Sequence, residues 1–383
     1  MTADFTEYVN LASRALGAGV VAANDEWFAE KENLLKAEPP VFVPHTFGPK
    51  GQIMDGWETR RRRGSSAEHP HPEPDAHDWA IVRLGVPGVL RGIVVDTAFF
   101  TGNYPPSGSV EAASVPGTPS VEELLDPAVR WTTIVARTDL KGDTAHPFTV
   151  TSGQRFTHVR LNIFPDGGVA RLRVYGEAVP DPAWLDGLTV DLAAQEYGAL
   201  AEAASDRYFS SPHNLNAPGR SRVMGEGWET RRRRDDGHDW VRVRLVEQAE
   251  ILAAEIDIDN YLGNAPGWVA LMGSDASVDP DAWFELLPRT RVQPDTRHRF
   301  RLTDVPPVTH VRIEVFPDGG VARLRLPGRL TEAGLTALRN RFGSSERQRT
   351  FARTEGPRQP ALGAPTLGAP TLGKTGAAIP RNS

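Results

Sequence analysis

The chain has 383 residues, a formal net charge of -6 at pH 7 and no cysteine. The lack of cysteine excludes a disulfide framework, a thiolate zinc site and a cysteine nucleophile. The negative charge, with a pI near 6.0, argues against a nucleic-acid partner or an anionic membrane surface. Residues 1–10 contain no apolar signal core, and no apolar segment is long enough for a membrane helix. We therefore expect a cytoplasmic protein without nucleic-acid or membrane partners.

Helical periodicity occurs in only three parts of the chain, which are residues 8–21, 190–204 and 332–341. Most of the remaining chain favours strands. Residues 79–84 and 157–163 alternate apolar and polar side chains, which is the period of a half-buried strand. Such short strands with Gly and Pro between them predict a β-sandwich of the jelly-roll type.

Two Asp-Gly-Gly segments, at residues 166–168 and 318–320, have the composition of tight turns. Glycine adopts positive φ without strain, and each segment lies between two predicted strands. We therefore expect each segment to close a hairpin. The simplest role for Asp166 and Asp318 is turn formation.

The chain contains an internal duplication. Residues 56–63, Gly-Trp-Glu-Thr followed by four arginines, recur letter for letter at 227–234, and residues 164–173 recur at 316–325. The offset between the copies falls from 181 to 171, 161 and 152, which indicates three insertions in the first copy. Insertions of this size are typical of surface loops, and we expect residues 64–76 to form one.

These observations predict an all-β fold made of two tandem jelly-roll β-sandwiches with a few short helices. We expect the first repeat to span residues 1–185 and the second residues 186–343. Residues 344–383 are rich in Pro, Gly and Ala and have few residues able to build a core, so disorder is expected there.

Several motifs in this order resemble those of the allantoicase family. They are the Asp-x-Trp-Phe-Ala-x-x-x-Asn-Leu-Leu segment at 25–35, the Gly-Trp-Glu-Thr-Arg-Arg block, His77-Asp78-Trp79, Asp-Thr-x-Phe-Phe-Thr-Gly-Asn-Tyr-Pro at 96–105 and the doubled Phe-Pro-Asp-Gly-Gly-Val-Ala-Arg. The resemblance covers about residues 8 to 330. It implies two galactose-binding-like jelly rolls and hydrolysis of allantoate to (S)-ureidoglycolate and urea in purine catabolism. The second copy departs from the family pattern at Ile258 and Leu262.

Allantoate carries one carboxylate and two ureido groups on one carbon, so its site needs a guanidinium for the carboxylate and amide-type partners for the ureas. Release of urea also needs an acid/base group. If Trp57 lies in the core, a strand period places Glu58 and Arg60 together on the opposite face. They are then a candidate acid/base and its carboxylate anchor. An exposed ion-pair set is the alternative.

The same argument extends to other polar residues of the shared motifs. The expected catalytic residues are Glu58, His77, Glu229 and His238, and the expected substrate-binding residues are Arg60, Asn103, Arg171, Arg231, Asn264 and Arg323. Plainer roles stay open for several of them, because a histidine at a strand start and an asparagine before Tyr-Pro are also common loop residues. Trp57, Trp79, Trp228 and Trp240 are expected in the core.

A second class of function stays open at this point, a non-catalytic tandem module that binds carbohydrates or small anions. Binding modules favour exposed aromatic residues on loops, whereas the letters shared by the copies are Glu, Arg, His, Asp and Asn. The enzyme is therefore the favoured interpretation, with allantoate as substrate and a homo-oligomer as the expected assembly. No standard metal-ligand spacing occurs, so no metal site is assigned and a need for a divalent metal ion is left open.

Overall fold

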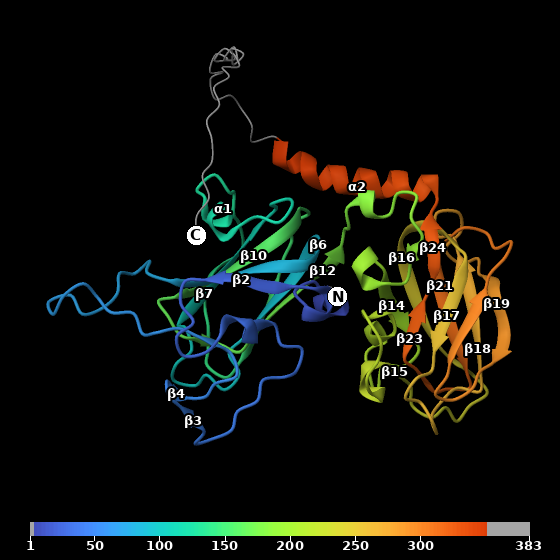
Figure 1. Ribbon diagram of the computed structural model, residues 1–383, viewed down its shortest axis with the longest axis horizontal. Coiled ribbons are helices and arrows are strands. Elements are labelled where there is room, and N and C mark those ends of the chain that lie inside the picture. The colour runs from blue at the N-terminus through green and yellow to red at the C-terminus, as the bar shows by residue number, and fades with distance from the viewer. Residues whose placement is uncertain (1–3, 351–383) are drawn as a thin grey trace, which may run out of the picture.

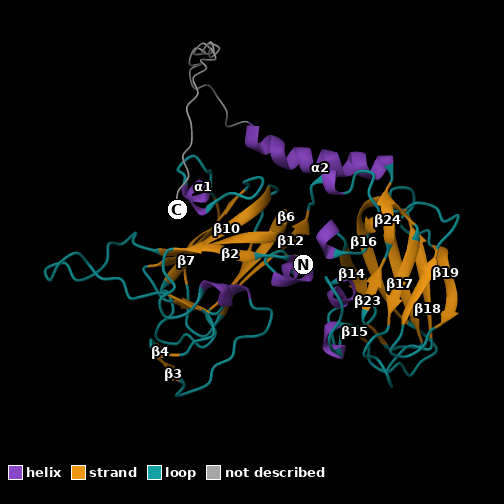
Figure 2. Ribbon diagram, viewed as in Figure 1, coloured by secondary structure: helices purple, strands orange, loops and turns teal. Residues whose placement is uncertain are grey.

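The computed structural model describes residues 4–350, without the side chains of residues 344–350. Two strand-rich units lie side by side, and helix α2 (Glu332–Thr350) lies over the second unit and reaches toward the first (Figure 1). Most of the ordered structure is strand, and helix outside α2 is confined to short segments (Figure 2). Disorder was expected from residue 344 to 383. Residues 344–350 belong to α2 instead, and residues 351–383 lie outside the described residues.

The first repeat is organised around one long strand, β6 (Asp78–Asp96). The start of β6 pairs with β2 (Gly19–Ala23) and β10 (Arg155–Phe164). Its end pairs with β9 (Ala145–Thr149) and β12 (Arg171–Ala178), so the strand contributes to both layers of the sandwich. The sheet is completed by β1 (Val9–Asn10), β7 (Ser107–Ala113) and β8 (Thr132–Asp139).

The second repeat has the same strand order, with the long strand divided at Leu252 into β16 (Asp239–Ile251) and β17 (Ala253–Asp257). β16 pairs with β14 (Leu200–Ala204) and β21 (Val308–Phe316), as β6 does with β2 and β10. The further strands are β13 (Val190–Asp191), β18 (Trp268–Ser274), β19 (Phe284–Arg291), β20 (Arg297–Arg301), β23 (Arg323–Arg325) and β24 (Pro327–Leu330). The predicted tandem of two similar β-sandwiches is confirmed.

The two Asp-Gly-Gly segments do not close hairpins, and that prediction was wrong. β10 and β12 are both hydrogen-bonded to β6, which lies between them, so the segment crosses over from one side of β6 to the other. On the way it forms β11 (Gly168–Val169), which pairs with β5 (Trp57–Glu58). In the second repeat, β22 (Gly320–Val321) pairs with β15 (Trp228–Glu229) in the same way.

The predicted helices at 8–21 and 190–204 are also wrong. Residues 8–21 form β1, the 3-10 turn η2 (Arg14–Leu16) and most of β2. Gly17 ends the turn in the left-handed region, with φ of 87°, and Gly198 does the same in the second repeat with φ of 94°. The apolar residues that gave a helical period are thus divided between two strands. The helix predicted at 332–341 is confirmed as the start of α2.

The remaining short elements are as follows. They are η1 (Phe5–Glu7), η3 (Lys31–Leu35), β3 (Phe47–Gly48), β4 (Gly51–Gln52), α1 (Val121–Leu125), η4 (Pro182–Trp184), η5 (Gln195–Tyr197), η6 (Pro212–Asn216) and η7 (Met224–Glu226). Residues 64–76 form an exposed loop, as predicted. No helix among residues 4–350 is long and apolar enough to cross a bilayer.

Each sandwich has its own apolar core. Trp57 is fully buried in the first core and Trp228 in the second, which confirms two of the four predicted core tryptophans. Trp79 and Trp240 are only half-buried. In both of those motifs the neighbouring aspartate, Asp78 or Asp239, is the buried residue because it accepts hydrogen bonds from an arginine.

Candidate active site

Glu58 lies at the end of β5, where the strand direction turns it away from the core. The preceding Trp57 fills the core, and its Nε1 donates to the main-chain oxygen of Asp25 at 2.7 Å. Glu58 therefore projects to the other side, as the strand period predicts, and is half-buried there. Asn103 Nδ2 donates to Glu58 Oε1 at 2.8 Å, so two motifs 45 residues apart meet at one carboxyl group.

An open pocket of about 740 Å³ surrounds this pair. Its polar lining residues include Glu58, Asn103, Asp166, Lys50, Arg61 and Arg63, and its aromatic lining residues are Phe28, Phe42, Phe99 and Tyr104. Lys50 and Phe42 come from the segment between η3 and β5, which contains one of the insertions in the first copy. Two carboxyl groups, an amide and three cations thus line one cavity.

The four consecutive arginines divide into two pairs with different surroundings. Arg60 Nε is 2.6 Å from Asp25 Oδ2, and Arg62 Nη2 is 2.7 Å from Asp78 Oδ1. Arg61 and Arg63 line the pocket and form no ion pair within residues 4–350. Alternation along the extended segment thus directs two arginines to aspartates of the scaffold and two to the pocket.

Burial raises the pKa of Glu58, while the hydrogen bond from Asn103 and the charge of Arg61 act in the opposite direction and only partly offset it. A raised pKa keeps a larger fraction of the carboxyl protonated near neutral pH. Glu58 is therefore suited to giving up a proton as well as accepting one, which is the property expected of an acid/base catalyst.

The Asp-Gly-Gly segment joins the two halves of the site. Asp166 Oδ2 accepts from the main-chain nitrogen of Arg62 at 2.7 Å, and the nitrogen of Gly168 donates to the main-chain oxygen of Asn103 at 2.8 Å. Gly167 has φ of 140°, and a side chain there would meet the nitrogen of Pro105 at 2.6 Å. The doubled motif is therefore a clamp that fixes Glu58 and Asn103 relative to each other.

The other expected site residues of the first repeat lie outside the pocket lining. His77 Nδ1 is 2.8 Å from the Asp75 main-chain oxygen, and its ring packs on Phe164. Arg171 is 2% exposed and its Nη2 lies 2.7 Å from Asp55 Oδ2. Arg171 thus holds the insertion against the sandwich.

The second repeat reproduces the carboxyl and amide pair. Asn264 Nδ2 donates to Glu229 Oε1 at 2.7 Å, and Arg231 is bound by Asp206 as Arg60 is by Asp25. Arg323 is buried and donates to the main-chain oxygens of Gly219 and Glu226. His238 lies 3.6 Å from Glu314 and stacks on Phe316.

The surroundings of this second pair differ from those of the first. The second repeat lacks the insertion that supplies Phe42 and Lys50. At the positions of Phe99, Thr101 and Tyr104 it has Asn260, Leu262 and Ala265. The Glu–Asn pair thus occurs in both repeats, whereas the residues that surround it differ between them.

Sequence reasoning identified Glu58 and Asn103, which the fold brings together, and missed Arg61, Arg63 and Lys50. One feature of the sequence could have indicated Arg61 and Arg63. Asp25 and Asp78 both have counterparts in the second copy, at Asp206 and Asp239, and two acids suffice for only two of four arginines. Within residues 4–350 no group of three or more His, Cys, Asp or Glu side chains is arranged to hold a metal ion.

The fold and the site together define a tandem β-sandwich protein with a carboxyl and amide pair in each sandwich and an open pocket, lined by an added lysine, over the pair of the first. The family model described as the allantoicase repeat matches residues 9–179 and again 190–331. The chain belongs to the allantoicase family.

Individual relatives agree with this assignment. A probable allantoicase of Streptomyces avermitilis is 58% identical over 344 residues, which are 89% of this chain and 91% of the relative. A probable allantoicase of Pseudomonas aeruginosa is 44% identical over 85% of this chain and 97% of the relative. The crystal structure of allantoicase from Saccharomyces cerevisiae matches with a TM-score of 0.69 and 33% identity, covering 84% of this chain and 93% of that one.

Proposed function

We propose that the pocket over the first repeat is the site at which this chain hydrolyses allantoate to ureidoglycolate and urea. The observation that carries the proposal is the meeting of Glu58, Asn103 and Arg61 in one cavity. These three groups match an acid/base, a partner for a urea and an anchor for a carboxylate. Membership of the allantoicase family supports the enzyme over the non-catalytic binding module.

In the proposed binding mode, Arg61 and Arg63 hold the carboxylate of allantoate, because they line the pocket and form no salt bridge within residues 4–350. A guanidinium binds a carboxylate through two parallel hydrogen bonds, which fixes its orientation as well as its position. Asn103 has a second amide hydrogen and a carbonyl oxygen beyond its bond to Glu58, and these suit a ureido group.

In the proposed reaction, protonated Glu58 gives its proton to the nitrogen of the departing ureido group as the bond from that nitrogen to the central carbon breaks. The nitrogen of the other ureido group supplies its lone pair to the same carbon, which forms a C=N bond. Water then adds to the carbon and loses a proton to the Glu58 carboxylate. One water is consumed, urea leaves, and Glu58 ends in its starting state.

The test is to incubate the purified protein with allantoate and to measure urea and ammonia together. Urea without ammonia is the expected result. Stoichiometric ammonia would show that an amide bond of the ureido group is cleaved instead, and would count against the proposal. The cytoplasmic location and the homo-oligomer stay predictions from the sequence.

A further inference from the structure

Phe99 has a backbone conformation that aromatic residues rarely adopt. Its φ is 66°, in the left-handed region where a side chain crowds the backbone. Asparagine is enriched several-fold in this region, whereas a bulky residue there is an outlier. Such outliers cost free energy and concentrate at functional sites, where the surrounding structure holds them in place.

The duplication provides an internal control for this position. The counterpart of Phe99 in the second repeat is Asn260, with φ of 74°. The two loops are held alike, because the nitrogen of Phe99 donates to Asp143 Oδ1 and that of Asn260 to Asp295 Oδ1, both at 2.8 Å. The same backbone thus carries a residue suited to it in one copy and an unsuited one in the other.

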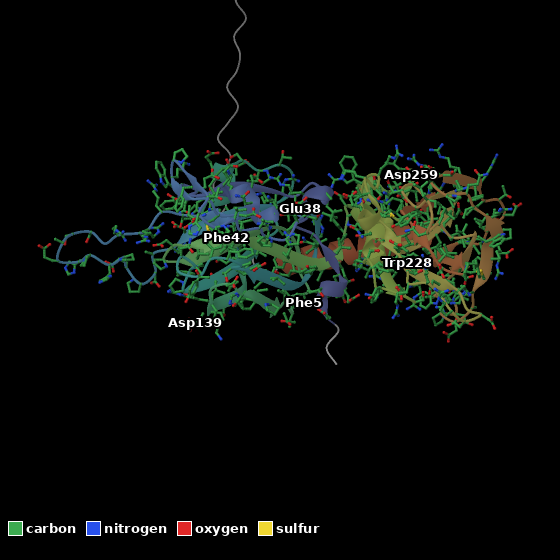
Figure 3. All side chains as sticks on the ribbon, turned by 90° about the horizontal axis from the view of Figure 1, so that it is seen from below. Phe5, Glu38, Phe42, Asp139, Trp228 and Asp259 are labelled. Carbon is green, nitrogen blue, oxygen red and sulfur yellow. The ribbon has the colours of Figure 1, made fainter. Side chains whose placement is uncertain are left out.

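The ring of Phe99 forms one side of the pocket together with Phe42. The two rings stack with centroids 5.9 Å apart and planes 22° apart, and both line the cavity that contains Glu58. Phe42 lies on the first repeat (Figure 3), in the insertion that the second repeat lacks. Phe99, whose backbone conformation does not suit an aromatic residue, therefore occurs in the repeat where Phe42 can stack on its ring.

The position of Phe42 is fixed from within the first repeat. The nitrogen of Val41 donates to Asp55 Oδ2 at 3.0 Å, and the same oxygen accepts from the buried Arg171 at 2.7 Å. Arg171 also donates to the main-chain oxygen of Glu38. The chain is thus held to the sandwich before Phe42, at Glu38, and after it, at Asp55.

We propose that Phe42 and Phe99 form an aromatic wall that packs against a planar ureido group of the substrate, so that Phe99 is a substrate-binding residue retained against the preference of its backbone. The inference rests on the proposed function, because that function supplies the ureido group. A flat apolar wall excludes water from one face of the group and leaves its edges free for Asn103 and Glu58.

The test exchanges the two counterparts. Phe99→Asn places in the first repeat the residue that the second repeat has in the same conformation, so the thermal midpoint should stay the same or rise. The kcat/KM for allantoate should fall by about tenfold to a hundredfold, since small misplacements of substrate cost this much, and the Kd measured by calorimetry should rise. Phe99→Tyr, which keeps the ring, should leave both kcat/KM and Kd near their wild-type values. A merely structural role predicts a lower midpoint with unchanged kinetics.

Two further variants complete the test. Asn260→Phe, the matched control, should lower the midpoint and leave kcat/KM unchanged. Phe42→Ala combined with Phe99→Asn should lose little more than the worse single variant, because both remove the same wall. A folded Phe99→Asn protein with wild-type kcat/KM and Kd would overturn the inference. A wild-type protein that binds allantoate without releasing urea would refute the proposed function, while a weaker Kd in Phe99→Asn would still support the wall.

Discussion

Glu58 lies between an amide that donates to it and a cluster of arginines, in a position that is half-buried. Burial raises the pKa of this carboxyl. In the folded protein the group therefore binds protons more tightly than in the unfolded chain. The stability that it contributes is present below the ordinary carboxyl pKa and is lost as the pH rises through the raised value. The site is thus expected to cost stability at neutral pH.

The first prediction follows from the loss of stability that the raised pKa of Glu58 causes at neutral pH. Glu58→Gln removes the ionisable group and keeps the shape, so it should raise the thermal midpoint relative to wild type at pH 7 by more than at pH 4. Thermal melts of both proteins across this range measure the difference. A difference that does not vary with pH would show that the environment of Glu58 does not disfavour its charged form.

The second prediction separates the two pairs of arginines. Arg61→Ala should raise KM or lower kcat/KM for allantoate strongly, because a guanidinium bound to a carboxylate contributes about 1.5–3 kcal/mol. Arg60→Ala should have a small effect on kinetics, because Arg60 does not line the pocket and its side chain is 65% exposed beside Asp25. Steady-state kinetics of the two neighbouring variants provide the comparison. Equal losses in both would remove the distinction between scaffold and site.

At this scale the sequence predicted the side of the chain on which Glu58 lies, because Trp57 beside it is apolar and had to be buried. The same period did not extend to Arg60. β5 ends at Glu58, and from Thr59 onward the chain direction is set by hydrogen bonds to Gly167 and Asp166. Those partners are 104 or more residues away in the sequence, so local periodicity could not reveal them.

At the scale of elements, strands with strict alternation were predicted correctly, and the connections between them were not. Residues 79–84 and 157–163 lie in β6 and β10 as expected. The turn composition of Asp-Gly-Gly carries no information on which strand comes next in space, and here β6 separates the two strands it joins. The functional consequence is that the segment is free to bind both Arg62 and Asn103.

The third prediction concerns β5 and β15, whose tryptophans occupy the two cores. Trp57→Ala should destabilise the first repeat by about 3–5 kcal/mol, the range for emptying a buried aromatic position. Trp228→Ala, the matched change in the second repeat, should do the same there. Chemical denaturation of each variant measures the loss. A change below about 1 kcal/mol would mean that these strands do not depend on their tryptophans.

At the scale of the whole molecule, the duplication separates what the fold needs from what the first site adds. Both repeats keep the Glu and Asn pair, the Asp-Gly-Gly clamp and two arginines that form salt bridges to aspartates. Only the first has the insertion carrying Phe42 and Lys50. The sequence predicted the two sandwiches through the repeat itself. The asymmetry of the sites became visible only when the insertion was placed beside Glu58.

The fourth prediction follows from that asymmetry. Glu58→Gln should lower the rate of urea release by about 10²–10⁴, the usual effect of losing an acid/base group. Glu229→Gln should lower it less, because the second pair lacks the added cation and aromatic wall. Both substitutions are isosteric and are made at matched positions, so thermal melts of the two variants serve as the control for folding.

The central claim, that the pocket containing Glu58 hydrolyses allantoate, is tested most directly by initial rates of urea release from allantoate, with ammonia determined in the same samples. The predicted result is urea without ammonia from the wild-type protein and from Glu229→Gln, and almost none from a folded Glu58→Gln protein. Wild-type urea release from Glu58→Gln would contradict the claim.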